Sequence, residues 1–384
     1  MKITIHRGSH QIGGCCTEIS TDTSRILIDF GSELDGSAQL HINGVTEGRS
    51  CCNAVLFSHY HGDHIGLVES INVDIPLYIS GLSLSILKQQ NKKQKIFNEK
   101  IVNRIETYKA TSPLSFGDIT VTPFMVDHSA FDSHMFLIEA DGKKVLHTGD
   151  FRAHGFRGKG LIPTLEKYVG KVDVLICEGT TVSRKKEVSV TESELTFKAK
   201  EILQENKYVF VACASTNIDR IAAICAAVPR GKYCVCDAYQ KSILDIVKEK
   251  SGKYSRLYNF PKMLTYNSSL DDKMLHQGFC MFIRPGNFLS TRLLEKYKDK
   301  SPLVIYSMWH GYLQQNENLK NALGGFRMIE LHTSGHADSK TIDRVISKTK
   351  PKLIIPIHTD APEQFANLSA VRVVDDGEII TVTS

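Results

Sequence analysis

No stretch of the sequence approaches the roughly 18 uninterrupted apolar residues that a membrane-spanning helix requires. The N-terminal residues turn polar after one short apolar segment, so we expect no signal peptide. The ten cysteines contain no repeated Cys-x-x-Cys, which argues against a disulfide framework and against a thiolate zinc site. Internal repeats and low-complexity tracts are also lacking. These absences favour a cytoplasmic protein in a reducing compartment, with no membrane partner.

A strong charge of either sign is lacking as well. The net charge is +5 over 384 residues, with 42% hydrophobic and 23% charged residues, which is enough apolar content for one large or two medium domains. The mild positive charge permits an anionic substrate such as nucleic acid without arguing for one, so any basic patch must be local.

Several apolar segments in the first half of the chain predict strands. The early ones are residues 2–6, 25–29 and 54–58. Later ones end directly on a histidine or an acid: residues 119–126 precede His128, residues 144–147 precede Asp150, and residues 172–177 precede Glu178. Polar side chains just past strand ends are a common way to build a site on a rigid scaffold.

The pattern changes after Glu178, where a capping box at residues 191–194 opens a helical segment. Strands and helices then alternate, which implies a parallel sheet. We therefore predict a doubly wound α/β domain at residues 180–325, inserted into a first domain made of residues 1–179 and 326–384. In the last stretch, a strand at 352–357 ends on His358, and residues 371–382 predict a closing hairpin.

The richest group of candidate ligands is the run from Ser58 to Gly66. It contains His59, His61, Asp63 and His64 within six residues. Zinc and similar divalent metals favour imidazole and carboxylate ligands. A polar surface loop is the alternative, but this spacing directly after an apolar strand favours a metal site. His128 and Asp150 would be unremarkable in isolation.

Together these residues have the layout of the metallo-β-lactamase superfamily, a four-layer αββα sandwich whose metals lie at the sheet ends. The resemblance implies that His59, His61 and His128 hold a first metal, and that Asp63 and His64 belong to a second site. It also implies that Asp150 bridges the two. Asp29 resembles the family's first acidic motif, which supports the ligand loop from behind instead of binding metal.

Three later residues, Glu178, His336 and His358, resemble the β-CASP branch of that superfamily. Members of this branch interrupt the sandwich with an α/β domain, as predicted here for residues 180–325. The resemblance implies that His358 completes the second metal site, that Glu178 is the branch's acidic motif, and that His336 faces the substrate. The cofactors it implies are two divalent ions, Zn²⁺ with Mn²⁺ as the alternative.

Two short segments resemble the ribonuclease J group within the branch, and each lies just before a predicted helix, where backbone N–H groups favour a phosphate. The candidate substrate contacts in them are Ser334, Gly335, His336, Ser215, Asn217 and Arg220. Helix capping is the alternative for Ser215 and Asn217, and an exposed surface charge is the alternative for Arg220. The chain stops soon after His358, so we expect it to lack that group's C-terminal domain.

The resemblance implies a ribonuclease that cleaves phosphodiester bonds in single-stranded RNA, in exo or endo mode, with a dinuclear zinc-activated hydroxide. Asp63 could accept a proton, His336 could stabilise developing charge, and Glu178 is better suited to orienting a histidine. One alternative is a hydrolase of a small ester, lactone or amide. Another is a binding protein with a degenerate site, against which the apparently complete ligand set argues. A homodimer is compatible with the sequence.

Overall fold

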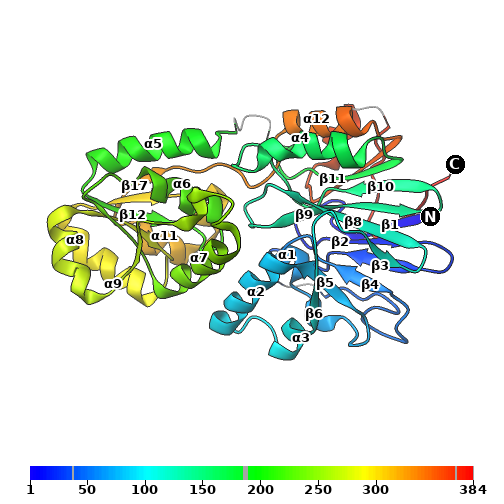
Figure 1. Ribbon diagram of the computed structural model, residues 1–384, viewed down its shortest axis with the longest axis horizontal. Coiled ribbons are helices and arrows are strands. Elements are labelled where there is room, and N and C mark those ends of the chain that lie inside the picture. The colour runs from blue at the N-terminus through cyan, green and yellow to red at the C-terminus, as the bar shows by residue number, and fades with distance from the viewer. Residues whose placement is uncertain (37–38, 185–188, 368–369, 384) are drawn as a thin grey trace. The chain divides into compact units, whose positions relative to one another are not determined.

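The computed structural model describes residues 1–36, 39–184, 189–367 and 370–383 (Figure 1). The chain divides into two compact units. The first unit comprises Met1–Ala153, Arg157–Val188 and Gly335–Ser384, and the second comprises His154–Phe156 and Ser189–Ser334. These limits differ by several residues from the domain boundaries predicted at 179/180 and 325/326. No helix in the described part of the chain is long and apolar enough to cross a membrane.

The first unit contains two mixed sheets. A seven-stranded sheet has the order β19-β1-β2-β3-β4-β5-β6, and a six-stranded sheet has the order β18-β11-β10-β9-β8-β7. The strands of the first sheet are β1 (Lys2–Arg7), β2 (Cys16–Ser20), β3 (Arg25–Ile28), β4 (Ala54–Leu56), β5 (Leu77–Ser80), β6 (Ile105–Tyr108) and β19 (Ile379–Thr381). The strands of the second are β7 (Leu114–Phe116), β8 (Ile119–Val126), β9 (Ser133–Ala140), β10 (Lys143–His147), β11 (Val174–Glu178) and β18 (Leu353–Ile357).

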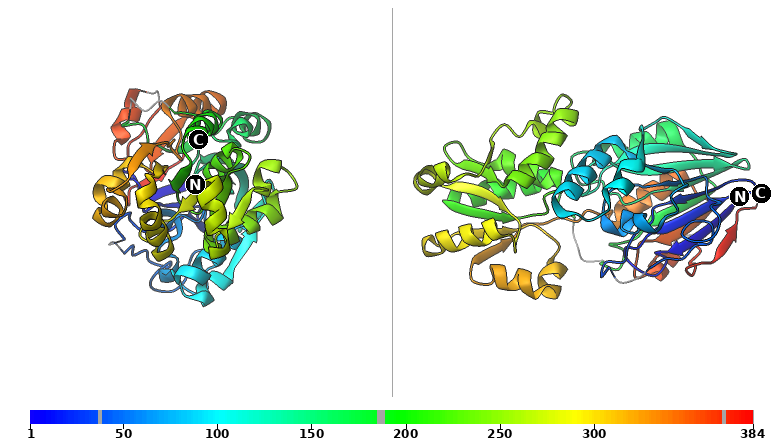
Figure 2. Two further views of the ribbon diagram at one scale, coloured as in Figure 1. Left: turned by 90° about the vertical axis from the view of Figure 1, so that its left-hand side faces the viewer. Right: turned by 90° about the horizontal axis from the view of Figure 1, so that it is seen from below.

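The two sheets pack face to face around one apolar core, which holds side chains from both (Figures 1 and 2). Ile26 and Ile28 of β3 belong to this core together with Phe136 and Ile138 of β9. A second core lies on the other face of the six-stranded sheet, where Leu137 and other strand residues pack against helices. The strands β9 and β11 are buried along almost their whole length because both of their faces are covered.

Helices complete the layers of the first unit. α4 (Leu161–Thr164) and α12 (Ser339–Thr349) contribute buried side chains to the core on the six-stranded sheet. α2 (Gly81–Gln94) contacts β5 and β6 of the seven-stranded sheet and is followed by α3 (Glu99–Arg104). The order helix, sheet, sheet, helix is the αββα sandwich that the sequence resemblance implied.

The second unit is built on one fully parallel sheet of the order β14-β13-β15-β12-β16-β17. Its strands are β12 (Tyr208–Ala212), β13 (Tyr233–Cys236), β14 (Met263–Thr265), β15 (Phe279–Ile283), β16 (Leu303–Tyr306) and β17 (Arg327–Glu330). Its helices are α5 (Glu192–Glu205), α6 (Ile218–Ala227), α7 (Ala238–Ser251), α8 (Asp271–Gln277), α9 (Phe288–Tyr297), α10 (His310–Gln315) and α11 (Glu317–Leu323). The capping box predicted at Thr191 and Glu194 opens α5. This is the inserted α/β domain.

Two details differ from the sequence prediction. β17 pairs with β16 and so belongs to the second unit's sheet, although the predicted domain boundary lay before it. All four of its side chains are exposed, and its adjacent apolar residues Met328 and Ile329 form too short a run to mark a strand in the sequence. The hairpin expected at residues 371–382 is wrong. Val371 instead bridges to Ile354 in the six-stranded sheet, whereas β19 pairs with β1 in the other sheet, so this segment crosses between the two sheets.

Candidate metal centre

The candidate ligands gather at the ends of first-unit strands. His59 and His61 lie between β4 and α1 (Gly62–Ile65), and His128 follows β8. Asp150 follows β10 and His358 follows β18. Because β10, β11 and β18 are neighbours and run parallel, their carboxyl ends meet at one edge of the sheet. The strand ends therefore bring together residues that lie far apart in the sequence.

Three imidazoles form a first group. One ring nitrogen each of His59, His61 and His128 lies within 4.8 Å of the other two. His128 Nε2 lies 3.3 Å from His61 Nδ1, while Nδ1 of His128 donates to the carbonyl oxygen of Gly335 at 2.6 Å. That hydrogen bond fixes the His128 tautomer and leaves Nε2 as a lone-pair donor toward the group.

A second group combines imidazoles with carboxylates. His358 Nε2 lies 3.2 Å from Asp63 Oδ2, and His64 Nε2 lies 3.1 Å from Asp150 Oδ2. The other nitrogen of each ring, Nδ1, contacts a residue outside the group. His64 Nδ1 is 2.8 Å from Asp29 Oδ2, and His358 Nδ1 is 2.7 Å from the hydroxyl of Thr180. Both rings are thus oriented by partners outside the group.

Asp150 lies between the two groups. Its Oδ2 is within 4.0 Å of imidazole nitrogens from both sides, namely those of His59, His64, His128, His336 and His358. A carboxylate in this position can contact two ions at once. The bridging role that the sequence resemblance implied for Asp150 stays a prediction.

Asp29 supports the ligand loop and does not join either group. Its carboxylate accepts hydrogen bonds from the backbone N–H of Ser58 at 2.7 Å and from the Ser58 hydroxyl, in addition to its contact with His64. The carboxylate is completely buried. The place of Asp29 therefore agrees with the expectation that it holds the loop from behind.

Glu178 and His336 lie beside the ligands. The buried Glu178 accepts hydrogen bonds from the backbone N–H groups of Phe151, Thr180 and Ala337, and its Oε1 is 3.3 Å from His336 Nδ1. The His336 side chain is 20% exposed, whereas the side chains of His59, His64, His128 and His358 are at most 1% exposed. Glu178 therefore orients a ring that remains accessible at the edge of the centre.

Burial is the main cause of the pKa shifts in the first group. It lowers the pKa of His59 and of His128 well below the usual range, and it lowers the pKa of His61 to about 4. Neighbouring histidines lower the pKa of His59 further. All three rings are therefore neutral at physiological pH, which is the form that binds metal.

The second group behaves in the opposite way. Burial alone would lower the pKa of His64 and of His358, but the nearby carboxylates of Asp150 and Asp63 outweigh it, so both pKa values are raised. Burial likewise opposes ionisation of Asp63 and Asp150, yet the adjacent histidines hold both carboxyl pKa values low. The carboxylates thus require positive charge beside them.

The residues fit a pair of divalent ions. His59 Nε2 is fully buried and has no hydrogen-bond partner among the described residues, although it points at the ligand groups. A buried polar atom without a partner is costly unless a ligand satisfies it. Imidazole nitrogens and carboxylate oxygens are the donors that zinc prefers, and manganese also accepts them.

The predicted substrate residues of the second unit fall into different environments. Asn217 accepts a hydrogen bond from the backbone N–H of Arg220 and so caps α6. The Ser215 hydroxyl is buried and has no hydrogen-bond partner among the described residues. The backbone oxygen of Ser334 accepts from His154 Nε2 at 2.8 Å. For Ser215 and Ser334, contact with substrate stays a prediction.

The environment of Arg220 differs from both expectations drawn from the sequence, a substrate contact and an exposed surface charge. Arg220 is neither an exposed charge nor placed for direct phosphate contact, because it is completely buried. Its guanidinium forms a bidentate ion pair with Glu192 and donates to the Ser307 hydroxyl and to the carbonyl oxygen of Thr333. Arg220 therefore fixes the chain just before Ser334 from inside the second unit.

Two residues that lie close to the candidate ligands were not expected from the sequence, namely Thr180 and Cys15. Thr180 contacts His358 Nδ1 and lies 3.2 Å from His336 Nδ1, yet a threonine two residues after Glu178 belongs to no recognisable pattern. Cys15 lies within 4.8 Å of ligand nitrogens of His64 and His358. Burial, followed by the nearby carboxylates of Asp150, Asp63 and Asp29, raises the pKa of its thiol.

Comparison with known families agrees with this architecture. Residues 24–211 match a model described as a beta-lactamase superfamily domain. Residues 326–370 match one described as a Zn-dependent metallo-hydrolase RNA specificity domain. The second segment contains His336 and His358 of the candidate centre.

Several curated proteins are similar to this chain. It is 24% identical over 396 residues to a ribonuclease J of Helicobacter pylori, across 93% of this chain and 56% of that protein. A ribonuclease J of Mycoplasma pneumoniae is 23% identical, across 93% of this chain and 67% of its own length. A probable RNase of Methanocaldococcus jannaschii is 27% identical over 203 residues, covering 47% of this chain and 45% of that protein. This chain thus spans little more than half of the H. pylori relative.

A solved structure shares the whole fold. A protein of unknown function from Enterococcus faecalis V583 superposes with a TM-score of 0.77 at 21% sequence identity, covering 99% of both chains. At this identity the likeness establishes the fold alone.

Gly335 lies so close to the first group that adding a methyl group at this position should disturb metal binding. A Cβ at Gly335 would lie 2.6 Å from Ser129 Oγ and 3.4 Å from His128 Cε1. We expect Gly335→Ala to displace His128 and to weaken binding of one ion about 10- to 100-fold, measured by competition with a chelator. Gly160→Ala is the control, because its Cβ would meet no atom within 4 Å. Equal affinities for both variants would contradict this account.

The opposite pKa shifts predict that two bound ions leave at different pH. Protons on His64 and His358 compete with an ion at the second group as the pH falls through their raised pKa values. The first group keeps neutral imidazoles to lower pH, since the pKa of His61 is about 4. We expect the ion at the second group to be released at a higher pH than the ion at the first group, which should stay bound until the pH falls to about 4, measured as metal content after rapid desalting. Loss of both ions in one step would contradict the assignment.

The buried pair of Arg220 and Glu192 predicts a stability effect without a metal effect. Arg220→Ala leaves an unpaired buried carboxylate, so we expect the free energy of unfolding in urea to fall by about 3–5 kcal/mol with the metal content unchanged. Lys241→Ala breaks an exposed ion pair with Asp245 and should cost at most about 1 kcal/mol. A cost for Arg220→Ala as small as the control would show that Arg220 is not the anchor described here.

Proposed function

Because this chain is a β-CASP member of the metallo-β-lactamase superfamily and is similar to ribonuclease J, we propose that it is a metal-dependent ribonuclease. The observation that carries the proposal is the position of Asp150 Oδ2 within 4.0 Å of imidazoles from two ligand groups. The proposed substrate is single-stranded RNA, and the proposed reaction is hydrolysis of its phosphodiester bonds. The match of residues 326–370 to an RNA specificity domain supports this substrate.

The proposed cofactors are two divalent ions, zinc in the first instance, with manganese as the alternative. When bound, such a pair supplies Lewis acidity and lowers the pKa of water toward neutrality. The first ion would be held by His59, His61 and His128, and the second by Asp63, His64 and His358. Asp150 would contact both. The chemistry of this donor set supports zinc, because imidazole and carboxylate are its usual ligands besides thiolate.

The chain's own residues have separable proposed roles in the reaction. Asp63 is the proposed acceptor of the proton that the attacking water loses, since its carboxylate is held ionised by His64 and His358. His336 is the proposed group that stabilises charge on the phosphoryl or leaving oxygen, because its ring is accessible at the edge of the centre. Glu178 is a positioning residue, which orients His336 and holds Ala337.

The backbone around Ser334 and Gly335 is one proposed contact to substrate phosphates, and the Ser215 hydroxyl is a separate proposed contact. The Ser215 hydroxyl supports this role, because it is buried without a hydrogen-bond partner among the described residues. Asn217 contributes through α6, whose N-terminus it caps. A homodimeric state and a cytoplasmic location stay predictions from the sequence.

The test is cleavage of single-stranded RNA by the metal-loaded protein, with 5′-monophosphorylated and 5′-hydroxyl substrates compared. We expect RNA cleavage that is abolished in His61→Ala, because this substitution removes a ligand of the first group. Cleavage of the monophosphorylated substrate alone would support attack from a 5′ end. Inertness toward both RNAs, together with turnover of small esters, lactones or amides, would overturn the proposal.

His336→Ala separates the proposed chemistry from metal binding. We expect the rate of cleavage to fall about 10²- to 10⁴-fold while the metal content stays unchanged. Loss of metal in this variant would mean that His336 is a ligand and not a group that acts on the substrate. Glu178→Gln should reduce the rate less than His336→Ala, because its effect acts through the orientation of the ring.

A further inference from the structure

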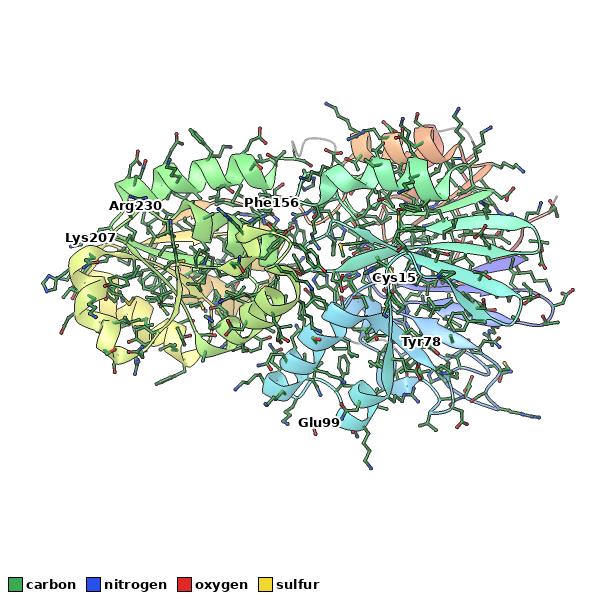
Figure 3. The ribbon with its side chains drawn as sticks, viewed as in Figure 1. Cys15, Tyr78, Glu99, Phe156, Lys207 and Arg230 are labelled. Atoms are coloured by element: carbon green, nitrogen blue, oxygen red, sulfur yellow. The ribbon has the colours of Figure 1, made fainter. Side chains whose placement is uncertain are left out.

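Cys15 is a buried thiol that the sequence pattern and the proposed reaction leave without a role. It directly precedes β2 and lies in the interior of the first unit (Figure 3). We propose that Cys15 is a further ligand of the second metal ion, in addition to the residues that the family resemblance assigns. The proposal rests on the divalent metal centre of the proposed function but does not depend on its substrate.

The backbone of Cys15 is fixed to the ligand loop. Its N–H donates to the carbonyl oxygen of Asp63 at 3.0 Å, and its carbonyl oxygen accepts from the N–H of Gly31 at 3.0 Å. Asp63 is itself one of the proposed ligands. Two hydrogen bonds on opposite sides of one residue fix the direction of its Cα–Cβ bond, so the thiol can rotate but stays next to the loop that carries the ligands.

The thiol faces the second group. Cys15 Sγ and one ring nitrogen each of His64 and His358 all lie within 4.8 Å of one another. The Nδ1 atoms of both rings are engaged by Asp29 and Thr180, while their Nε2 atoms approach the carboxylates of Asp150 and Asp63. The sulfur therefore converges on a set of donors that is already arranged for a cation, which distinguishes it from an isolated buried cysteine.

The distances between the Cys15 sulfur and the ring nitrogens of His64 and His358 suit coordination of one metal ion. Zinc binds sulfur at about 2.3 Å and imidazole nitrogen at about 2.0–2.1 Å, so two such ligands of a tetrahedral ion lie about 3.6 Å apart. A set of atoms within 4.8 Å needs to contract by about 1 Å at most to reach this separation. Rotation of the Cys15 side chain and small movements of two rings are sufficient for such a contraction.

A sulfur ligand would set the metal preference of the second site. Thiolate is a soft ligand that favours zinc, cobalt and iron over manganese, whereas a site of imidazole and carboxylate alone accepts manganese more readily. With Cys15 bound, the two ions would therefore differ in selectivity, and the site next to Cys15 would be the more selective for zinc.

The neighbouring Cys16 provides a matched control. It is also completely buried and its thiol is also free, but it is the first residue of β2 and is paired with Arg7 across the sheet. The groups that shift the pKa of Cys16 are led by burial, Glu18 and Arg7, not by the ligands of the second ion. Cys15→Ser and Cys16→Ser thus remove the same atom at adjacent buried positions with different surroundings.

The experiment is the electronic spectrum of the metal-free full chain after loading with Co²⁺. We expect a near-ultraviolet thiolate-to-cobalt charge-transfer band in the wild type and in Cys16→Ser. In Cys15→Ser, this band should be absent, while the visible cobalt bands remain. A wild-type protein that binds two Co²⁺ without the band, or a Cys15→Ser protein that keeps it, would overturn the proposal. Because no RNA is present, the result is independent of whether the chain cleaves RNA.

X-ray absorption spectroscopy of the zinc-loaded wild type tests for a sulfur ligand without the need for a variant. We expect sulfur scattering at about 2.3 Å from zinc, and its absence at full zinc occupancy would refute the proposal. In competition between zinc and manganese, Cys15→Ser should shift the ratio of the two affinities at one site toward manganese by about tenfold or more. Unchanged selectivity, matching that of Cys16→Ser, would contradict the assigned role.

Discussion

The negative charge buried around Asp150 is the constraint on which the rest of the centre depends. Asp29, Asp63 and Asp150 lie within one small region, and none of them is more than slightly exposed. A buried carboxylate is tolerated only beside positive charge or several hydrogen-bond donors. The raised pKa values of His64 and His358 are the response of the chain itself to this charge. Two divalent ions would meet the same demand more completely, since each replaces a proton with a double charge.

The outer partners of the ligands explain why this arrangement is specific. The Nδ1 atom of His64 contacts the Asp29 carboxylate, and the Nδ1 atom of His358 contacts the Thr180 hydroxyl. The Nδ1 atom of His128 donates to the carbonyl oxygen of Gly335. In each case the bond directs Nε2 toward the centre and selects one tautomer. These partners come from separate parts of the chain, so the ligand geometry depends on the packing of the whole first unit and not on the histidine-rich loop alone.

The run with His59, His61, Asp63 and His64 could be recognised in the sequence because it follows an apolar strand, whereas His128, Asp150 and His358 were assigned to the same site only through the family resemblance. The inserted α/β domain could be predicted from its alternating strand and helix patterns, whereas the αββα layers were implied by the family resemblance. Other features depend on packing that leaves no such pattern. Arg220 lies at the start of a helix, where an exposed charge is common, and only the buried partner Glu192 reveals its role. Thr180 and Cys15 carry no local signal at all, and the exposed strand β17 lacks the apolar run that predicts one.

The connections to the inserted domain are part of the metal centre. The chain leaves the first unit after Glu178, Thr180 and Thr181, and it returns at Gly335, His336 and Ala337. Glu178 and Thr181 hydrogen-bond to the backbone of Ala337, Thr180 contacts His358, and Gly335 holds His128. The segments next to these two connections are therefore hydrogen-bonded to each other and to candidate ligands of both groups.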